Sequence, residues 1–239
     1  MVAKQKKEVH LEWICRNVQQ RRVAVVLKTD LFEEANGEDE LLSSLPFEAD
    51  LKLGIDVDES TARRAALRLD GNSGFAAADV RRLPFKNDSI DLVLSNSTLD
   101  HFEVAEDLQH SICELARVLK PGGLLLITLD NPRNPLYRLF RAGVQWCGIS
   151  FRLGHTASSS ELVRLLKHAG LEPISTDLLL HNPRFLSTLL FMALRRLRAG
   201  DRVIGALLKL FSLAGTLPTR CYTAVFVAAC GRKPERPGS

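Results

Sequence analysis

Four short apolar segments of the sequence each run into polar residues whose types suit binding and proton transfer. Carboxylates accept hydrogen bonds from hydroxyl, amino and ammonium groups, and a histidine takes up or releases a proton near neutral pH. The polar residues that follow these segments are Lys28, Thr29, Asp30, Asp56, Asp79, Asn96, Ser97 and His101. Their positions predict one polar site if the four segments end side by side in the folded chain.

The elements that would position these residues alternate between strand-like and helical patterns. Strands are predicted at 23–27, 51–56, 74–78, 90–95 and 124–129. Helices are predicted at 8–20, 31–45, 60–69 and 104–119. This alternation favours an α/β fold with a doubly wound, mostly parallel sheet, which binds ligands at the carboxyl ends of its strands.

The pattern loosens after residue 130. Helices are expected at 134–146 and at 158–169, the second with Ser158 or Ser159 as N-cap. Strands are expected at 171–180 and 221–229, separated by two amphipathic helices within 183–218. We therefore expect a single domain with an N-terminal helix, a core, a helical insertion, a last strand and a tail, at 1–22, 23–182, 183–218, 219–231 and 232–239.

The overall composition is that of a soluble globular protein. Apolar residues make up 46% of the 239, and the net charge of +4 is too small to argue for nucleic acid. The five cysteines are widely spaced, which favours free thiols over a zinc site or a disulfide framework, so no metal is expected. The sequence has neither a signal-peptide pattern nor a run of ~18 apolar residues. We expect a cytoplasmic protein.

Two segments, with a third in support, indicate a family. They are 78–85 with 88–93 (ADVRRLPF, DSIDLV), 114–123 (ELARVLKPGG) and 54–56 (GID). In this order they resemble the class I S-adenosylmethionine-dependent methyltransferases that act on small molecules. The resemblance implies a seven-stranded, Rossmann-like sheet whose last strand, at 221–229, is antiparallel, and S-adenosylmethionine as the cofactor. In such a chain Pro121-Gly122-Gly123 ends a helix and turns into the fifth strand.

The resemblance also assigns cofactor contacts. Asp56, followed by Val57, would accept hydrogen bonds from the ribose hydroxyls, although a solvated loop acid or a helix N-cap explains Asp56 equally simply. Asp79 would accept a hydrogen bond from the adenine amino group, and the backbone amide of Val80 would serve the ring. The alternative for Asp79 is a turn acid paired with Arg81 or its neighbour Arg82.

The stretch 96–101 (NSTLDH) follows the fourth predicted strand, where the family lines both cofactor and acceptor. Asn96 and Ser97 are thus assigned to the cofactor. His101 is the first candidate for a catalytic base, because it can accept a proton from an acceptor hydroxyl. His101 can equally be a loop histidine bonded to the backbone, and His155 is a weaker candidate for the same role.

The turn after the first strand departs from the family pattern. The family has a glycine-rich turn there, whereas this chain has Lys28, Thr29 and Asp30 and no glycine before Gly37. In one interpretation these three residues form a polar floor, in which Lys28 attracts the carboxylate of the cofactor and Asp30 its ammonium group. In the other interpretation, bulky side chains fill the site and the domain binds nothing.

The acceptor is expected under the variable segments 130–154 and 183–218. Both are rich in leucine and arginine, which favours a small apolar or lipid-like acceptor over nucleic acid. The basic helices of 183–218 suit either packing on the sheet or another subunit, or peripheral contact with an anionic membrane. The sequence thus predicts transfer of a methyl group to an oxygen atom of a small apolar or lipid-like acceptor. A catalytically degenerate scaffold is the alternative.

Overall fold

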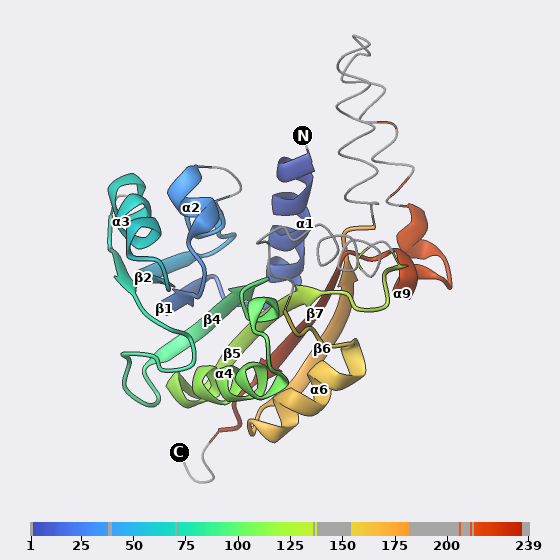
Figure 1. Cartoon of the computed structure of the whole chain (residues 1–239). Coiled ribbons are helices and arrows are strands. Elements are labelled where there is room, and N and C mark those ends of the chain that lie inside the picture. The colour runs from blue at the N-terminus through green and yellow to red at the C-terminus, as the bar shows by residue number, and fades with distance from the viewer. Residues whose placement is uncertain are drawn as a thin grey trace.

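The computed structural model describes residues 2–37, 40–69, 71–135, 137, 154–181, 206, 211 and 213–235. Within them, one sheet has the strand order β3-β2-β1-β4-β5-β7-β6 (Figure 1). The strands are β1 (Arg22–Lys28), β2 (Glu48–Asp56), β3 (Ser73–Ala77), β4 (Ile90–Asn96), β5 (Leu119–Asp130), β6 (Glu172–Leu179) and β7 (Phe226–Arg232). Pairings are parallel except that β7 is antiparallel to both β5 and β6, which confirms the predicted fold.

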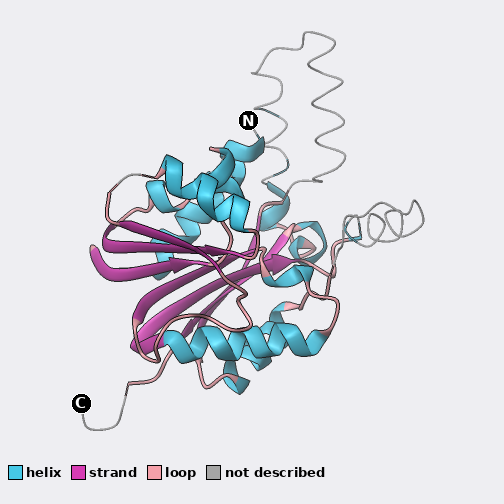
Figure 2. Ribbon diagram, turned by 60° about the vertical axis from the view of Figure 1, so that its left-hand side comes forward, coloured by secondary structure: helices cyan, strands magenta, loops and turns pink. Residues whose placement is uncertain are grey.

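Helices cover both faces of this sheet, cyan over magenta in Figure 2. On one face, α1 (Val2–Asn17), α2 (Phe32–Asn36) and α3 (Glu59–Arg68) share an apolar core with the sheet. On the other face, α4 (Ala105–Val118) and α6 (Ser159–His168) share a second core. Short turns of helix occur at η1 (Leu42–Ser44), η2 (Leu99–His101), η3 (Leu213–Thr216) and α9 (Arg220–Thr223).

Local sequence explains how the longer helices begin. The Ser158 side chain and the Glu161 side chain form a reciprocal capping box at the start of α6, as the predicted N-cap requires. Asp58 caps α3 by accepting hydrogen bonds from the backbone amides of Ser60 and Thr61. These caps fix where the chain turns from each loop into the helix that follows.

The single helix expected at 31–45 is wrong, because the chain bends back after α2. Gly37 has φ 72° and ends α2 in the left-handed conformation. The carboxylate of Glu34 then accepts the backbone amides of Leu41 and Leu42, at 3.1 and 3.3 Å, and holds the returning chain against the helix. A buried acid that holds the chain where it leaves the helix is not visible in the apolar spacing.

The segment Pro121-Gly122-Gly123 lies inside β5 and not in a turn before it. Helix α4 ends at Val118, strand β5 starts at Leu119, and the β4–β5 register shifts between Ile90 and Leu92. Gly122 has φ 79°, and a Cβ on Gly123 would lie 3.0 Å from the carbonyl oxygen of Asp91. The glycines therefore permit a bulge at the start of a central strand.

The last strand begins five residues later than expected, at Phe226, because 220–223 is helical. The side chain of Asn131 donates hydrogen bonds to the carbonyls of Cys221 and Ala224, and that of Asn134 donates to Ala224 as well. These bonds take the carbonyls that a longer strand would use. The expected helix at 134–146 and most of 183–218 lie outside the described residues.

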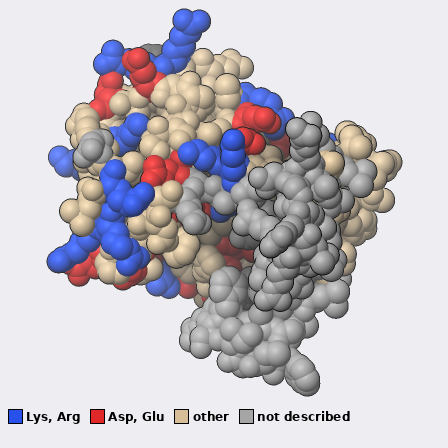
Figure 3. All heavy atoms as spheres, turned by 90° about the horizontal axis from the view of Figure 1, so that it is seen from above, with Lys and Arg blue, Asp and Glu red and all other residues tan. Residues whose placement is uncertain are grey.

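The surface charges fit the small net charge. On the face shown in Figure 3, basic side chains lie interspersed with acidic ones. Among the described residues, no helix is long and apolar enough to cross a membrane.

The packing of β4 gives a test of the fold. Leu94 is fully buried at the centre of the sheet, whereas Leu67 on α3 is 86% exposed. We expect Leu94→Ala to lower the free energy of unfolding by about 2–5 kcal/mol, because it removes buried methyl groups and leaves a cavity. Leu67→Ala should change it by less than about 0.5 kcal/mol. Urea unfolding of both variants checks this, and equal effects would contradict the assigned burial.

Candidate active site at the carboxyl edge of the sheet

The ends of β1, β2 and β4 meet at the point where the strand order reverses. Lys28, the last residue of β1, lies opposite Gly54 of β2 and Leu94 of β4. The backbone amide of Thr29 donates to the carbonyl of Leu94 at 3.1 Å. The turn after β1 is therefore held between its two neighbouring strands, at the position where doubly wound sheets bind ligands.

The bulky side chains of the glycine-free turn point into the helical layer. Lys28 and Leu31 are both fully buried, and Leu31 belongs to the core beneath α1, α2 and α3. A Cβ on Gly54 would lie 2.5 Å from a methyl carbon of Leu31, so Gly54 makes room for this side chain. Lys28 and Leu31 therefore do not block the carboxyl edge of the sheet, as the second interpretation of this turn required.

Lys28 is held in a buried ion pair. Its Nζ lies 2.7 Å from Glu34, whose side chain is also fully buried, and 3.3 Å from Glu33, and it donates to the carbonyl of Asp30. Burial lowers the pKa of Lys28, but the carboxylates, Glu34 first, more than offset this and leave its pKa raised. Lys28 therefore has no free charge for a ligand carboxylate, which corrects that expectation.

Asp30 and Asp56 place two carboxylates near each other at this edge. Asp30 accepts the backbone amide of Phe32 at 2.9 Å. Burial raises the pKa of Asp30 against the opposing effect of Lys28, and Glu33 and Asp56 raise it further. A positively charged group bound beside Asp30 would relieve this repulsion.

Asp56 retains room for further hydrogen bonds. One oxygen accepts a hydrogen bond from the backbone amide of Asp58 at 2.9 Å. The other oxygen accepts one from the backbone amide of Leu31 at 3.1 Å. A carboxylate has about four acceptor positions, so hydroxyl donors can still bind. Asp56 is not the N-cap of α3, since Asp58 has that role. The next residue along the chain after Asp56, Val57, has an apolar side chain that is 79% exposed.

Asp79 is engaged by an arginine, as its alternative interpretation foresaw. Arg81 contacts both carboxylate oxygens, at 2.6 Å from Nη2, and also reaches Asp107 at 2.9 Å. These bonds, the Arg81 side chain first, lower the pKa of Asp79. The adenine contact predicted for Asp79 therefore requires Arg81 to give up some of these bonds, and the roles of Asp79 and of Val80, which is 7% exposed, stay predictions.

Buried oxygens without hydrogen bonds occur at the ends of β4 and β5. They are Asn96 Oδ1, Ser97 Oγ and Thr128 Oγ1. Asn96 lies opposite Thr128 in the β4–β5 pairing, and Ser97 has φ 48° while its amide donates to the carbonyl of Thr128. An unpartnered buried polar atom costs about 1–3 kcal/mol. These atoms are therefore candidates for hydrogen bonds to a polar ligand at the ends of β4 and β5.

The two candidate bases lie on adjoining segments, His101 at the end of η2 and His155 in the loop before α6. His101 is 54% exposed, with Nε2 3.9 Å from the buried carboxylate of Asp100. The amide of His155 donates to the carbonyl of Phe102 at 2.6 Å. This close approach depends on Gly154, where a Cβ would lie 2.2 Å from the carbonyl oxygen of Phe102. Both imidazoles remain open to solvent on the described surface, and the catalytic role of His101 stays a prediction.

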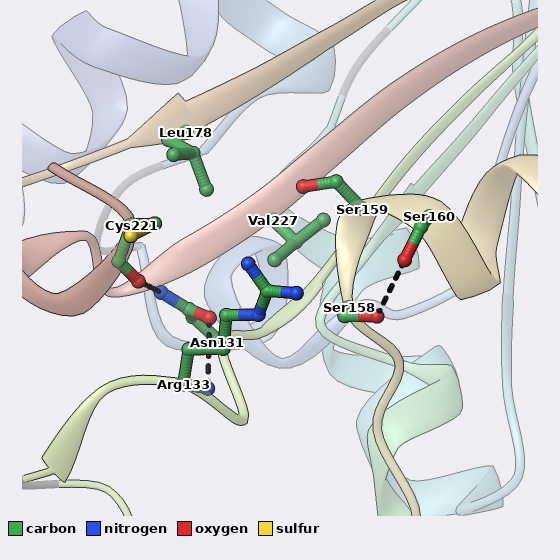
Figure 4. Close-up of a pocket in the computed structure, with 8 residues that line it drawn as sticks. All are labelled: Asn131, Arg133, Ser158, Ser159, Ser160, Leu178, Cys221 and Val227. Atoms are coloured by element: carbon green, nitrogen blue, oxygen red, sulfur yellow. Dashed lines mark hydrogen bonds between the residues drawn. The ribbon is translucent and has the colours of Figure 1, made fainter. Parts of the chain in front are cut away.

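A pocket of about 170 Å³ opens beyond the end of β5 (Figure 4). It is lined by Asn131, Arg133, Ser158, Ser159, Ser160, Leu178, Cys221 and Val227. No sequence pattern groups these residues, because they come from four segments between 131 and 227. Their grouping follows from the antiparallel pairing of β7 with β5 and β6.

His10 on α1, which no sequence pattern singles out, is buried beside Phe226 with ring centroids 5.3 Å apart. Its Nδ1 lies 2.8 Å from the carbonyl of Lys6, so that nitrogen carries the proton. Burial lowers the pKa of His10 to about 4, opposed by the Lys6 carbonyl. The nearby charges are Lys6, Glu33 and Lys28.

This depressed pKa predicts a pH dependence of stability. His10 binds a proton more readily in the unfolded chain than in the folded protein. The free energy of unfolding should therefore be highest above pH 6.5 and should fall as the pH drops toward 4. The expected loss is at most about 1.4 kcal/mol per pH unit. Urea unfolding between pH 7 and 5 tests this. His10→Gln should flatten the slope and His110→Gln, on the exposed side of α4, should not; identical slopes in all three proteins would contradict the prediction.

Residues 37–127 match the family described as "Methyltransferase domain". Malonyl-[acyl-carrier protein] O-methyltransferase 1 of Coxiella burnetii is 29% identical over 150 residues, which cover 52% of this chain and 50% of that protein. The chain spans about a third to a half of the length of the curated relatives it matches, with 31% and 50% for two of them.

Solved structures share the whole architecture. The complex of the Haloferax volcanii Trm112 methyltransferase activator with a putative methyltransferase contains a chain of TM-score 0.63 and 18% identity, with 100% of this chain and 95% of that one covered. The N-methyltransferase NodS of Bradyrhizobium japonicum, in complex with S-adenosyl-L-homocysteine, has TM-score 0.60 and 16% identity, with 96% and 87% covered. Residues 37–127 therefore match a methyltransferase domain, and the fold is that of these solved methyltransferase structures.

Proposed function

We propose that the chain binds S-adenosylmethionine at the ends of β1, β2 and β4 and transfers its methyl group to an oxygen of a small apolar or lipid-like acceptor. The observation that carries this proposal is the direction of the side chains in the glycine-free turn. Lys28 and Leu31 fill the core, which leaves Asp30 and Asp56 at the carboxyl edge. A domain that had lost its ligand would have no need to retain two partly buried carboxylates there.

The residues at this edge match the parts of the cofactor. Asp56 has free acceptor positions for the ribose hydroxyls, since each of its oxygens accepts one backbone amide. Asp30 suits the ammonium group, because a cation relieves the repulsion that raises its pKa. Asn96 and Ser97 offer buried oxygens without partners at the end of β4.

The chemistry is an in-line displacement, for which a bound sulfonium supplies an electrophilic methyl group. The chain mainly holds the acceptor oxygen in line with that group, since orientation lowers the barrier most. A hydroxyl acceptor must also lose a proton, and His101 is the base placed beside β4 for this step. A carboxylate acceptor needs no base.

Two relatives support an oxygen acceptor on an acyl chain. Both are named malonyl-[acyl-carrier protein] O-methyltransferase, and they are 29% and 36% identical to this chain over 150 and 85 residues. The acceptor of this chain is accordingly proposed to be an acyl group with an acidic or hydroxyl oxygen. The leucine-rich segments 130–154 and 183–218, which the sequence predicts to cover the acceptor, lie mostly outside the described residues.

The role of Asp56 can be measured by calorimetry with S-adenosylhomocysteine. We expect Asp56→Asn to weaken binding by about 1–3 kcal/mol, because ribose hydroxyls lose an ionised acceptor. Asp50→Asn is the matched control, since Asp50 lies earlier on β2 and bonds Arg22. A folded Asp56→Asn protein with wild-type affinity would exclude the ribose contact. No binding by the wild type at millimolar ligand would overturn the proposed function itself.

Asp30 can be tested with a pair of ligands. S-adenosylhomocysteine carries the ammonium group, and 5′-methylthioadenosine lacks it. We expect Asp30→Asn to weaken binding of the first by about tenfold, the value of one charge-assisted hydrogen bond, and to leave binding of the second unchanged. Equal losses for both ligands would show that Asp30 acts on the fold and not on the ammonium group.

A further inference from the structure

Arg133 is a cationic residue that lines the pocket beyond β5. Figure 4 shows its guanidinium directed into the space between Val227 and the start of α6. Its backbone amide bonds the side chain of Asn131 at 3.0 Å, which fixes where the side chain starts. Among the described residues, no carboxylate lies within ion-pair distance of this guanidinium.

The carboxylate of Glu161, whose pKa is slightly affected by Arg133, is already engaged in hydrogen bonds. It accepts the amide and the hydroxyl of Ser158 at 2.8 and 2.6 Å. These two bonds come first among the causes that lower the pKa of Glu161, and the charge of Arg133 is a minor one. Glu161 therefore closes the capping box of α6 and leaves the guanidinium available.

The pocket has two kinds of wall. Arg133 and the hydroxyl-bearing residues 158–160 form one side, and Leu178 and Val227 supply apolar surface opposite (Figure 4). Its volume of about 170 Å³ corresponds to about five water molecules. This is room for a carboxylate on a short apolar stem, and a planar guanidinium binds a carboxylate through two parallel hydrogen bonds.

The pocket also lies beside the proposed methyl-transfer site. Asn131 directly follows β5, and on that strand Thr128 lies opposite Asn96 of β4. An acceptor that reaches the end of β4 can therefore extend over β5 toward Arg133.

We propose that Arg133 and the walls of this pocket form a subsite for a carboxylate of the acceptor, so that the enzyme selects acidic acyl groups. The proposal rests on the proposed function, which it makes more specific. Arg133 binds and orients the acceptor, and no bond changes at this subsite.

Binding of malonate, followed by NMR titration at constant ionic strength in the presence of S-adenosylhomocysteine, tests the subsite. We expect saturable binding that Arg133→Gln weakens by about tenfold. Arg164→Gln is the matched control, because it removes the same charge from the exposed side of α6 and leaves the pocket lining intact. Arg133→Lys should recover little affinity, since it keeps the charge and loses the planar fork.

Equal malonate affinity in the wild type and in Arg133→Gln would overturn the subsite, as would absence of saturable malonate binding. Inorganic phosphate binding through Arg133 more tightly than malonate would overturn the assignment to a carboxylate. Binding of S-adenosylhomocysteine by the wild type is measured in the same samples. If it binds and malonate does not, only the subsite fails; if it does not bind, the proposed function fails.

Discussion

The buried pair of Lys28 and Glu34 holds the first turn of this protein in place. Neither side chain is exposed to solvent, and their charged atoms lie 2.7 Å apart. Removing one member of such a pair leaves an uncompensated charge in the core, which lowers the free energy of unfolding by about 3–5 kcal/mol. The second oxygen of Glu34 also binds the amides of Leu41 and Leu42. One interaction therefore joins β1, α2 and the chain that leads to β2.

The geometry of the candidate site follows from this anchor. With Lys28 drawn into the helical layer, Leu31 packs over Gly54 and its amide reaches Asp56. A glycine-rich turn makes room for a ligand by having no side chains, whereas this turn makes room by burying its large ones. Thr29, which is also buried, and Asp30 follow β1 at the switch point of the sheet.

The two halves of the carboxyl edge differ in chemistry. The ends of β1 and β2 carry carboxylates, which suit the hydroxyl and ammonium groups of the cofactor. Beyond β5 the charged group is the guanidinium of Arg133, facing hydroxyls and apolar side chains. Opposite charges at the two ends would orient a cofactor and an acidic acceptor toward each other over β4.

The sequence by itself determined the sheet, the order of its elements and the segments that end at the site, because strand and helix periodicity and capping residues such as Ser158 act locally. It also placed Asp56 at the carboxyl edge. It did not determine that Lys28 is buried, that Arg81 holds Asp79, or that Arg133 meets residues 158–160. Each of these depends on partners that only the folded sheet brings near, since a charged side chain takes the direction in which its partners lie.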